Sequence, residues 1–462
     1  MDSSASNHDT LFDDIIDIVP DGDALLDVTF ETSSDTLRMA RKAPRPRPNE
    51  KNTPNRIFKA KIRCGYRVKL SIVKEHSTYF KKLFVDTRFI EARSVAQTME
   101  RLAALQIKPS EALAKDLPRV KIEEDDNATQ SAEQDIIFGD LMRILHQKPV
   151  TYKTHHMRYF ATLAIQADRF DCLAVVRRNL STSLGGRMKF PATHSQITNG
   201  DNSDKPALSK ASEETLRQKI LVSWLLEVPL KMHAATKELI LYGSRRWSLD
   251  EAEGNYNYNA LWWNLPYGLE EEIHYRRQCI LRTIASIQGY FLRLYTSRER
   301  QCQLGYDSSV SCDSYQLGEL VKFLSTHDYL FPLDFSAIHL PDAIIKYTTT
   351  DIRSLISGLK HVPSYQIDKN HTSCGPRRHV STILDFIQTM LTSSAISIGP
   401  AWRKESTSLT WVRDEEADEG KIFRFTRSMA ANTQPGQPFY IGPDRLALAL
   451  FTARDWDWLP KE

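Results

Sequence analysis

Short stretches of alternating apolar and polar residues occur over the first 130 positions, and this pattern is typical of half-buried strands. The first stretch covers residues 24–30. Residues 56–62 and 67–72 alternate apolar with basic side chains, and residues 117–122 predict a short strand that runs into the acidic residues 123–126. These patterns predict a small sheet near the N-terminus.

Helical periodicity, with apolar residues three or four positions apart, first appears at residues 76–84 and then dominates the chain. Residues 135–146 form a strongly amphipathic stretch. Residues 157–176 predict two helices with a break near residues 168–171. The same pattern predicts further helices over residues 216–226, 233–241, 277–295, 316–324 and 380–391.

Prolines and local composition divide the chain into segments. Prolines between residues 44 and 54 block helix formation and strand pairing, so we expect a disordered, basic, proline-rich insert at residues 32–55. The expected fold class is α+β, with a small sheet flanked by helices and then a mainly α-helical region. The predicted organisation is a flexible N-terminus at residues 1–19, a domain at 20–180, a linker at 181–212, a helical region at 213–395 and an irregular segment at 396–462.

Composition and charge favour a folded, soluble protein. Hydrophobic residues make up 41% of the chain and the formal net charge is only +3, so a core can form and no global field favours nucleic acid. No stretch approaches the roughly 20 uncharged apolar residues of a membrane helix, and the polar N-terminus does not resemble a signal peptide. We expect a cytoplasmic or nuclear protein without a membrane partner, whose six cysteines are thiols or metal ligands.

Three cysteines and one histidine in the second half suggest a metal site. The candidate ligands are Cys302, Cys312, His371 and Cys374. Thiolates and an imidazole are the donors of structural zinc sites, and two ligand pairs from separate segments would join those segments. The His-x-x-Cys spacing suits a metal-binding turn, whereas nine residues between the first two cysteines require a folded loop near Gly305. The alternative is that these cysteines are buried apolar thiols.

The insert also carries a basic patch. Between residues 38 and 63 the chain has ten Lys or Arg residues and one acidic residue. Such a segment can contact phosphates or direct nuclear import, or it can be a charged loop with no partner. Aromatic residues do not interleave with the basic ones, so we do not expect a nucleic-acid platform. The candidate residues are Arg38, Arg41, Lys42, Arg45, Arg47 and Lys51.

Catalytic motifs are missing from the sequence. It has no Gly-x-Ser-x-Gly elbow, no glycine-rich phosphate loop with Lys-Ser/Thr and no His-Glu-x-x-His motif. The acidic residues 270–272, followed by His274, stand where a helix is expected to begin, and the helix macrodipole accounts for acids there. We therefore do not expect an enzyme.

Four segments in the first 180 residues resemble the divergent fungal BTB/POZ family. They are Asp27-Val28 in the first predicted strand, the helix pattern at residues 76–84, the strand and acidic turn at residues 117–126, and the Ala-Asp-Arg-Phe-Asp-Cys motif at residues 167–172. Residues 297–318 and 371–375 resemble the C-terminal helical region of the same proteins. In two respects the chain departs from the family: Lys69 stands where a His is common, and the segments after residues 30 and 89 are long.

The resemblance implies a protein-interaction adaptor rather than a catalyst. Family members pair with themselves, with cullin ubiquitin ligases or with transcription co-regulators, so the expected partner is another protein. A nuclear DNA-associated regulator that uses the basic insert is the alternative. Candidate interface residues are Tyr79, Phe80, Phe84 and Phe89, most of which we expect to lie in the core.

Overall fold

The computed structural model is a mixed α+β protein, as the sequence predicted. Contacts divide it into unit 1 (residues 1–193, 218–228 and 256–264) and unit 2 (residues 194–217, 229–255 and 265–462). The residues that the structure describes are 12, 14–42, 58–151, 156–182, 208–248, 259–305, 307–329, 347–372, 374–402, 410–411, 422–426, 429 and 442–459.

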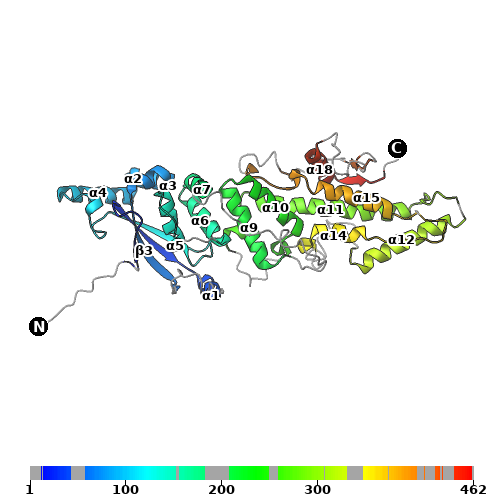
Figure 1. The fold of residues 1–462 in the computed structure, drawn as a ribbon, viewed down its shortest axis with the longest axis horizontal. Coiled ribbons are helices and arrows are strands. Elements are labelled where there is room, and N and C mark those ends of the chain that lie inside the picture. The colour runs from blue at the N-terminus through cyan, green and yellow to red at the C-terminus, as the bar shows by residue number, and fades with distance from the viewer. Residues whose placement is uncertain are drawn as a thin grey trace. The chain divides into compact units, whose positions relative to one another are not determined.

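The described part of unit 1 is built on a four-stranded mixed sheet (Figure 1). The strands are β1 (Asp14–Asp17), β2 (Ala24–Glu31), β3 (Lys61–Val68) and β4 (Arg119–Asp125), in the order β1-β3-β2-β4. β2 and β3 are antiparallel, whereas β1 is parallel to β3 and β4 is parallel to β2. The inner strand β2 is buried along almost its whole length, and Leu26, Val28 and Phe30 place apolar side chains at alternate positions on one face.

A partly buried ion pair lies within this sheet. The side chain of Asp27 in β2 is only 2% exposed. Arg63 of β3 donates to its carboxylate from Nε at 2.8 Å and from Nη2 at 2.6 Å. This two-point contact compensates the desolvation of a carboxylate that would otherwise be costly at this position.

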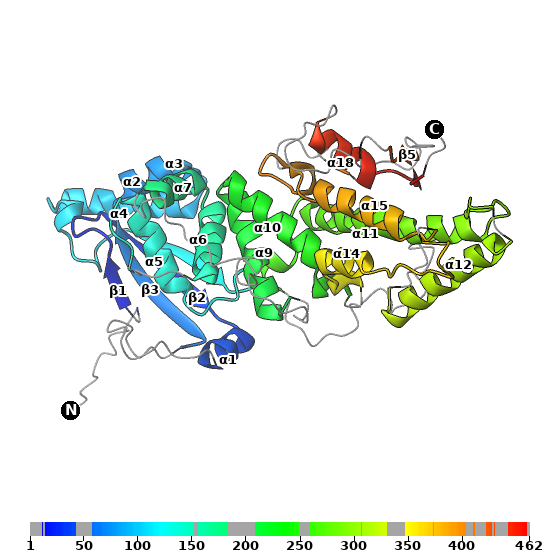
Figure 2. The ribbon, with the colours of Figure 1, turned by 45° about the vertical axis from the view of Figure 1, so that its right-hand side comes forward.

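Helices pack on the sheet: α5 contacts β3 and α4 contacts β4 (Figure 2). Phe138 of α5 packs on Phe30 of β2 and Tyr66 of β3, with ring centroids 5.9 and 5.0 Å apart. The Tyr66 hydroxyl donates to the carbonyl of Asp135 at 2.7 Å. The helices of unit 1 are α1 (Ser34–Lys42), α2 (Leu70–His76), α3 (Thr78–Val85), α4 (Ile90–Ala104), η1 (Pro109–Glu111), α5 (Gln134–Leu145), α6 (Met157–Arg169), α7 (Leu173–Thr182) and η3 (Leu261–Trp263).

The helix pattern at residues 76–84 and the motif at residues 167–172 pack against each other. Ser77 caps α3 by accepting from the backbone N–H of Phe80 at 3.1 Å, and its hydroxyl donates to the carbonyl of Phe170 at 2.6 Å. The rings of Phe80 and Phe170 stack with centroids 5.3 Å apart. Two segments about 90 residues apart in the sequence therefore share one buried contact.

The proline-rich insert begins with a helix that the sequence did not predict. Ser33 precedes α1, accepts from the backbone N–H of Thr36 at 3.3 Å and donates to the carboxylate of Asp126 at 2.9 Å. This capping contact starts a helix before the prolines are reached. The prediction of disorder is therefore wrong for Ser34–Lys42, and residues 43–57 lie outside the described residues.

Residues 67–72 were predicted as a strand, but β3 ends at Val68 and α2 begins at Leu70. The carboxylate of Asp23 accepts from the backbone N–H of Leu70 at 2.7 Å and so satisfies a free donor at the start of this helix. That prediction is therefore wrong beyond Val68.

Two further elements of unit 1 were not predicted. α4 has only three buried positions, so its helical period is faint in the sequence. β1 lies in the segment expected to be a flexible N-terminus and pairs with β3 in parallel register, Asp14 opposite Cys64. The prediction of flexibility is therefore wrong for Asp14–Asp17.

Unit 2 is mainly helical and is organised around the 28-residue helix α11 (Figure 1). The division between the units falls inside α9, after Arg217. Among the described residues, none of the helices is both long enough and apolar enough to cross a bilayer. The elements are α9 (Lys210–Leu225), α10 (Pro229–Tyr242), η2 (Arg245–Ser248), α11 (Leu269–Thr296), α12 (Ser309–Thr326), α14 (Ile352–Lys360), α15 (Arg377–Met390), η4 (Ser394–Ile396), β5 (Ile422–Arg424), α18 (Pro443–Phe451) and β6 (Asp455–Asp457).

The described part of the C-terminal segment is more regular than predicted. β5 and β6 pair in parallel and α18 contacts α11. Trp458 is fully buried, and its indole N–H donates to Ser286 of α11 at 3.1 Å. A buried aromatic with its polar atom satisfied fixes the chain end on the helical unit.

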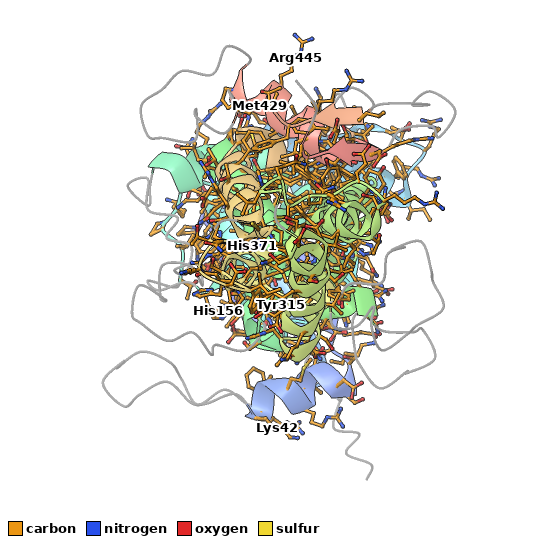
Figure 3. All side chains as sticks on the ribbon, turned by 90° about the vertical axis from the view of Figure 1, so that its right-hand side faces the viewer. Lys42, His156, Tyr315, His371, Met429 and Arg445 are labelled. Carbon is orange, nitrogen blue, oxygen red and sulfur yellow. The ribbon has the colours of Figure 1, made fainter. Side chains whose placement is uncertain are left out.

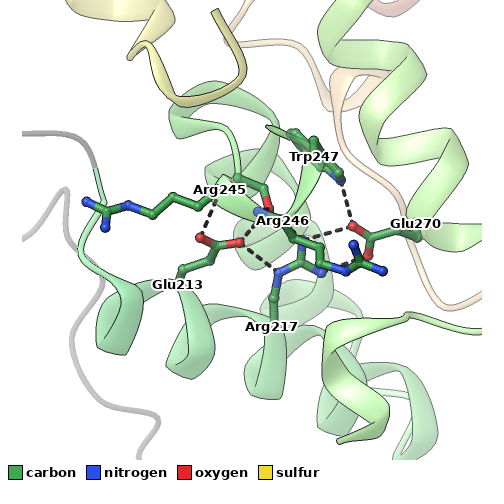
Figure 4. A network of polar contacts seen from close by, with 7 residues as sticks. Glu213, Arg217, Arg245, Arg246, Trp247 and Glu270 are labelled. Atoms are coloured by element: carbon green, nitrogen blue, oxygen red, sulfur yellow. Dashed lines mark hydrogen bonds and ion pairs between the residues drawn. The ribbon is translucent and has the colours of Figure 1, made fainter. Parts of the chain in front are cut away.

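A buried polar network joins the start of α11 to α9 (Figure 4). Arg217 is fully buried, and its guanidinium donates to Glu270 at 2.8 Å from both terminal nitrogens and to Glu213 at 3.0 Å from Nε. Ser244 accepts from Arg217 at 2.7 Å, and the Trp247 indole donates to Glu270 at 2.6 Å. Glu270 at this helix start therefore forms a specific ion pair in addition to its favourable place in the macrodipole.

Candidate metal centre

The structure brings together all four predicted metal ligands of unit 2. Cys302 lies in the turn after α11, Cys312 lies in the first turn of α12, and His371 and Cys374 lie between α14 and α15. The ligand atoms of the four residues all lie within 4.8 Å of one another. The prediction that these residues cluster is confirmed.

The spacing of the ligand atoms fits a tetrahedral metal ion. Zinc–sulfur bonds of about 2.3 Å and zinc–nitrogen bonds of about 2.05 Å at tetrahedral angles place sulfur atoms about 3.8 Å apart and sulfur and nitrogen about 3.6 Å apart. The Sγ atoms of Cys302 and Cys374 are separated by 3.8 Å. Nδ1 of His371 lies 3.4 Å from Sγ of Cys302 and 3.6 Å from Sγ of Cys374. These three donors therefore already have the separations that such an ion imposes, and Cys312 lies within 4.8 Å of each of them.

A hydrogen bond orients the imidazole for ligation. Nε2 of His371 lies 2.9 Å from the hydroxyl of Ser308, and Nδ1 faces the sulfur atoms. If Nε2–H donates to Ser308, Nδ1 keeps the lone pair that a metal needs. Asp368 is 3.8 Å from the same nitrogen and adds a carboxylate on that side.

The loop between the two first cysteines is closed by Asp313. Its carboxylate accepts from the backbone N–H groups of Gln301 at 2.9 Å and Cys302 at 3.0 Å. Gly305 adopts a φ of 72°, in the left-handed region that favours glycine, and this turns the chain back toward α12. These two features explain how a spacing of nine residues brings Cys302 next to Cys312.

The turn that carries Cys374 is also held in place. The hydroxyl of Tyr295, near the end of α11, donates to the carbonyl of Cys374 at 2.9 Å. At the next residue, Gly375, a side chain is excluded because a Cβ would lie 2.4 Å from Oε1 of the buried Gln316. The neighbouring helices thereby fix the backbone around this ligand.

The thiols of the cluster have very different proton affinities. Burial acts to raise the pKa of Cys302, but contacts with the Ser309 hydroxyl, a backbone N–H and the other cluster residues outweigh it and lower that pKa to about 7. Burial, followed by the charges of the other two thiols, raises the pKa of Cys312 to about 12. One thiolate therefore forms readily near neutral pH, whereas a cation is needed to deprotonate the whole set.

Burial of the cluster is uneven. His371 and Cys312 are fully buried, Cys302 is 4% exposed and Cys374 is partly exposed. In Figure 3 His371 is labelled within the dense side chains of unit 2, whereas Arg445 of α18 projects at its edge. A cleft of about 320 Å³ is lined by Cys302 and Cys374. His379 lines this cleft but is not part of the cluster.

The four candidate interface residues separate into two groups. Phe80 and Phe84 are buried, with exposed fractions of 0% and 7%, so they belong to the core of unit 1. Tyr79 and Phe89 are 39% and 43% exposed and remain available at the surface. Phe80 and Phe84 lie on the buried face of α3, Tyr79 lies at its exposed edge, and Phe89 lies outside α3, just before α4 begins.

Half of the basic patch can be described. Arg38, Arg41 and Lys42 are exposed on α1, where Arg38 pairs with Asp35 at 2.9 Å and Arg41 donates to the carbonyl of Phe58 at 3.4 Å. The other three candidates lie outside the described residues: Arg45, Arg47 and Lys51.

The supporting residues of the metal centre were missed in the sequence. Ser308 and Asp313 are polar residues beside the ligand Cys312, but their partners are 63 and 12 residues away. Tyr295 entered the prediction only as the last residue of the helix expected at residues 277–295. The only signal in the sequence that could have identified such supporting residues is their proximity to a ligand.

Comparison with known proteins gives no relative for this chain: a scan of protein-family models, a search of curated proteins and a search of solved structures each returned no match.

Proposed function

We propose that the chain is a protein-interaction adaptor in which unit 1 is a BTB-like domain and unit 2 is a companion domain held by structural zinc. The observation that carries the first part is the packing of Ser77 and Phe80 on Phe170, because it joins two separate segments of the family resemblance in one core. A small sheet with helices packed on it is the architecture that this resemblance implies.

The surface offered to a partner lies at the junction of α3 and α4. Val85, Phe89 and Ile90 are 64%, 43% and 73% exposed within six consecutive residues, and Tyr79 adds an exposed ring on α3. Single exposed apolar residues are ordinary, but a local group of them favours a contact surface. We call Tyr79, Val85, Phe89 and Ile90 the α3–α4 surface.

A double charge substitution tests this surface. Phe89→Asp with Ile90→Asp in the full chain removes its apolar character without touching a buried residue. We expect loss of self-association in sedimentation, or of a partner recovered from the native cell and then rebound as a purified protein. Leu230→Asp, at a position 84% exposed in unit 2, is the matched control. Unchanged association of the double variant would reject the proposed surface.

The zinc part of the proposal rests on the donor set and its spacing. Three cysteines and one histidine fill four tetrahedral positions and leave none for a substrate, which favours a structural role. Elemental analysis of protein purified without chelator should give about one zinc per chain. Cys302→Ser combined with Cys374→Ser should abolish it, and Cys279→Ser is the control because Cys279 is buried outside the cluster. Metal retained by the double variant would reject these ligands.

A DNA-associated role has weaker support. Of the described basic residues on α1, Arg38 and Arg41 already have partners within the chain. Nonspecific DNA binding that falls steeply with salt would favour this role, and no binding at low salt would exclude it.

A further inference from the structure

The cleft beside the metal centre exposes two of its four ligands and not the others. Cys302 and Cys374 line it, together with Tyr295, Thr372 and His379. Cys312 does not line it and is fully buried. A small solute that enters the cleft therefore reaches one particular pair of sulfur atoms.

The two cleft-facing sulfurs are also the pair that can move toward each other. They are 3.8 Å apart, and a disulfide requires about 2.05 Å. Cys302 and Cys374 both lie in turns between helices, whereas Cys312 is fixed in the first turn of α12. A shift of less than 2 Å, shared between two turns, is a small backbone adjustment.

We propose that the centre is a redox switch in which peroxide oxidises Cys374 and Cys302 to a disulfide and releases the zinc ion. This inference rests on the zinc part of the proposed function. The Cys374 thiolate attacks one oxygen of hydrogen peroxide, so that the O–O bond breaks, a sulfenic acid forms and hydroxide leaves. The Cys302 thiolate then attacks that sulfur, the S–S bond forms and a second hydroxide leaves.

The overall step is balanced. Two thiolates lose two electrons to one peroxide, and the two hydroxides take up two protons to become water. Zinc keeps only Cys312 and His371 as ligands, which is too few to hold it, because a disulfide sulfur is not a thiolate donor. A thiol reductant and added zinc reverse the change.

Loss of the ion affects the two turns that it joins. One lies between α11 and α12 and the other between α14 and α15. The Cys302–Cys374 disulfide still joins these turns, but release of the metal frees Cys312 and His371 from them, so the oxidant changes how α12 is held in unit 2. The aromatic core of unit 1 contains none of these ligands.

The test uses the zinc-loaded full chain. We expect peroxide to release about one zinc per chain into a chromophoric chelator. Peptide mapping after alkylation should then find Cys302 joined to Cys374 and Cys312 alkylated. A disulfide through Cys312, or zinc retained while other cysteines are oxidised, overturns the proposal. Protein that contains no zinc before oxidant is added fails the zinc proposal itself, so the two failures are distinguishable.

A variant that narrows the cleft tests the access route. Thr372 is exposed, lines the cleft and is not a ligand, so Thr372→Trp should slow peroxide-driven release roughly fivefold or more while zinc content stays the same. Thr87→Trp, at an exposed position of unit 1, is the control and should release zinc at the original rate. An unchanged rate in Thr372→Trp overturns the role of the cleft.

Discussion

The two units are stabilised by different kinds of interior. The core of unit 1 is mainly aromatic and aliphatic, with the Phe170 ring in contact with both Phe80 and Phe138, and its Asp27–Arg63 pair remains open to solvent on the arginine side. Unit 2 buries Arg217 with its carboxylate partners and a cluster of metal ligands. When an apolar contact is lost, the destabilisation scales with the apolar area removed. When a buried charge loses its partner, the full desolvation penalty of that charge remains. The difference predicts that unit 2 responds more steeply to single changes.

Removal of the metal should have the largest effect. We expect Cys312→Ala to abolish zinc binding and destabilise unit 2 by more than about 5 kcal/mol, because structural zinc supplies folding free energy directly. Hydrogen exchange should show lost protection in α11 and α12 and unchanged protection in β3 and α5. Cys172→Ala, at a buried thiol of unit 1 outside the cluster, is the control. Equal loss of protection in both units would contradict the comparison.

Removal of the buried guanidinium should be next. Arg217→Met leaves Glu213 and Glu270 buried without their cation, and we expect about 3–5 kcal/mol of destabilisation in denaturant unfolding. Arg38→Met removes an exposed pair with Asp35 and should cost under about 1 kcal/mol. Similar costs for the two variants would mean that the buried network does not stabilise unit 2.

The same network should make the stability of unit 2 fall at low pH. Burial acts to raise the pKa of Glu270, but the charge and hydrogen bond of Arg217 outweigh it, and the pKa lies below its ordinary value. The pair therefore contributes stability above the ordinary carboxyl pKa, and this contribution is lost as pH falls through the folded pKa. Arg217→Met should remove that part of the acid dependence.

The sequence correctly predicted the elements whose apolar positions follow a single helical or strand period. β2 and α5 were placed to within one residue at each end, and the break between α6 and α7 was found because their apolar faces are strong. The metal cluster was found because its chemistry is visible in the residue types alone. In each case the signal is local or carried by rare residues.

Other features depend on partners far away in the chain. α2 begins where Asp23 accepts from Leu70, 47 residues on, and no local pattern contains that contact. The pairing of Arg217 with Glu270 spans 53 residues and was likewise out of reach. Periodicity in the sequence shows which side of a helix or strand is apolar. It does not show which distant polar group will hydrogen-bond to the free backbone groups at a helix end or pair with a buried charged side chain.

In unit 1, a substitution at the contact between residues 76–84 and residues 167–172 should have a moderate effect on stability. Ser77→Ala removes the cap of α3 and leaves the buried carbonyl of Phe170 without its donor, at a cost of about 2–3 kcal/mol. Ser77→Thr keeps the hydroxyl and should recover most of the loss in thermal unfolding. If Ser77→Ala does not change the stability, aromatic stacking alone is sufficient to hold these two segments together.

The smallest effect should have the opposite sign and comes from Glu124 of β4. Burial, only partly offset by Arg169, raises the pKa of Glu124 from 4.5 to about 7. Between these values the folded chain binds a proton that the unfolded chain has lost, so the free energy of unfolding falls as pH rises. Glu124→Gln should therefore stabilise unit 1 by about 1–2 kcal/mol at pH 8 and not at pH 4, since its neutral amide avoids the cost of a buried charge. Glu123→Gln, at the exposed neighbour, should leave the pH profile unchanged. A destabilised Glu124→Gln at pH 8 would mean that the ion pair with Arg169 exceeds the burial penalty, and unit 1 would then depend on buried charge as unit 2 does.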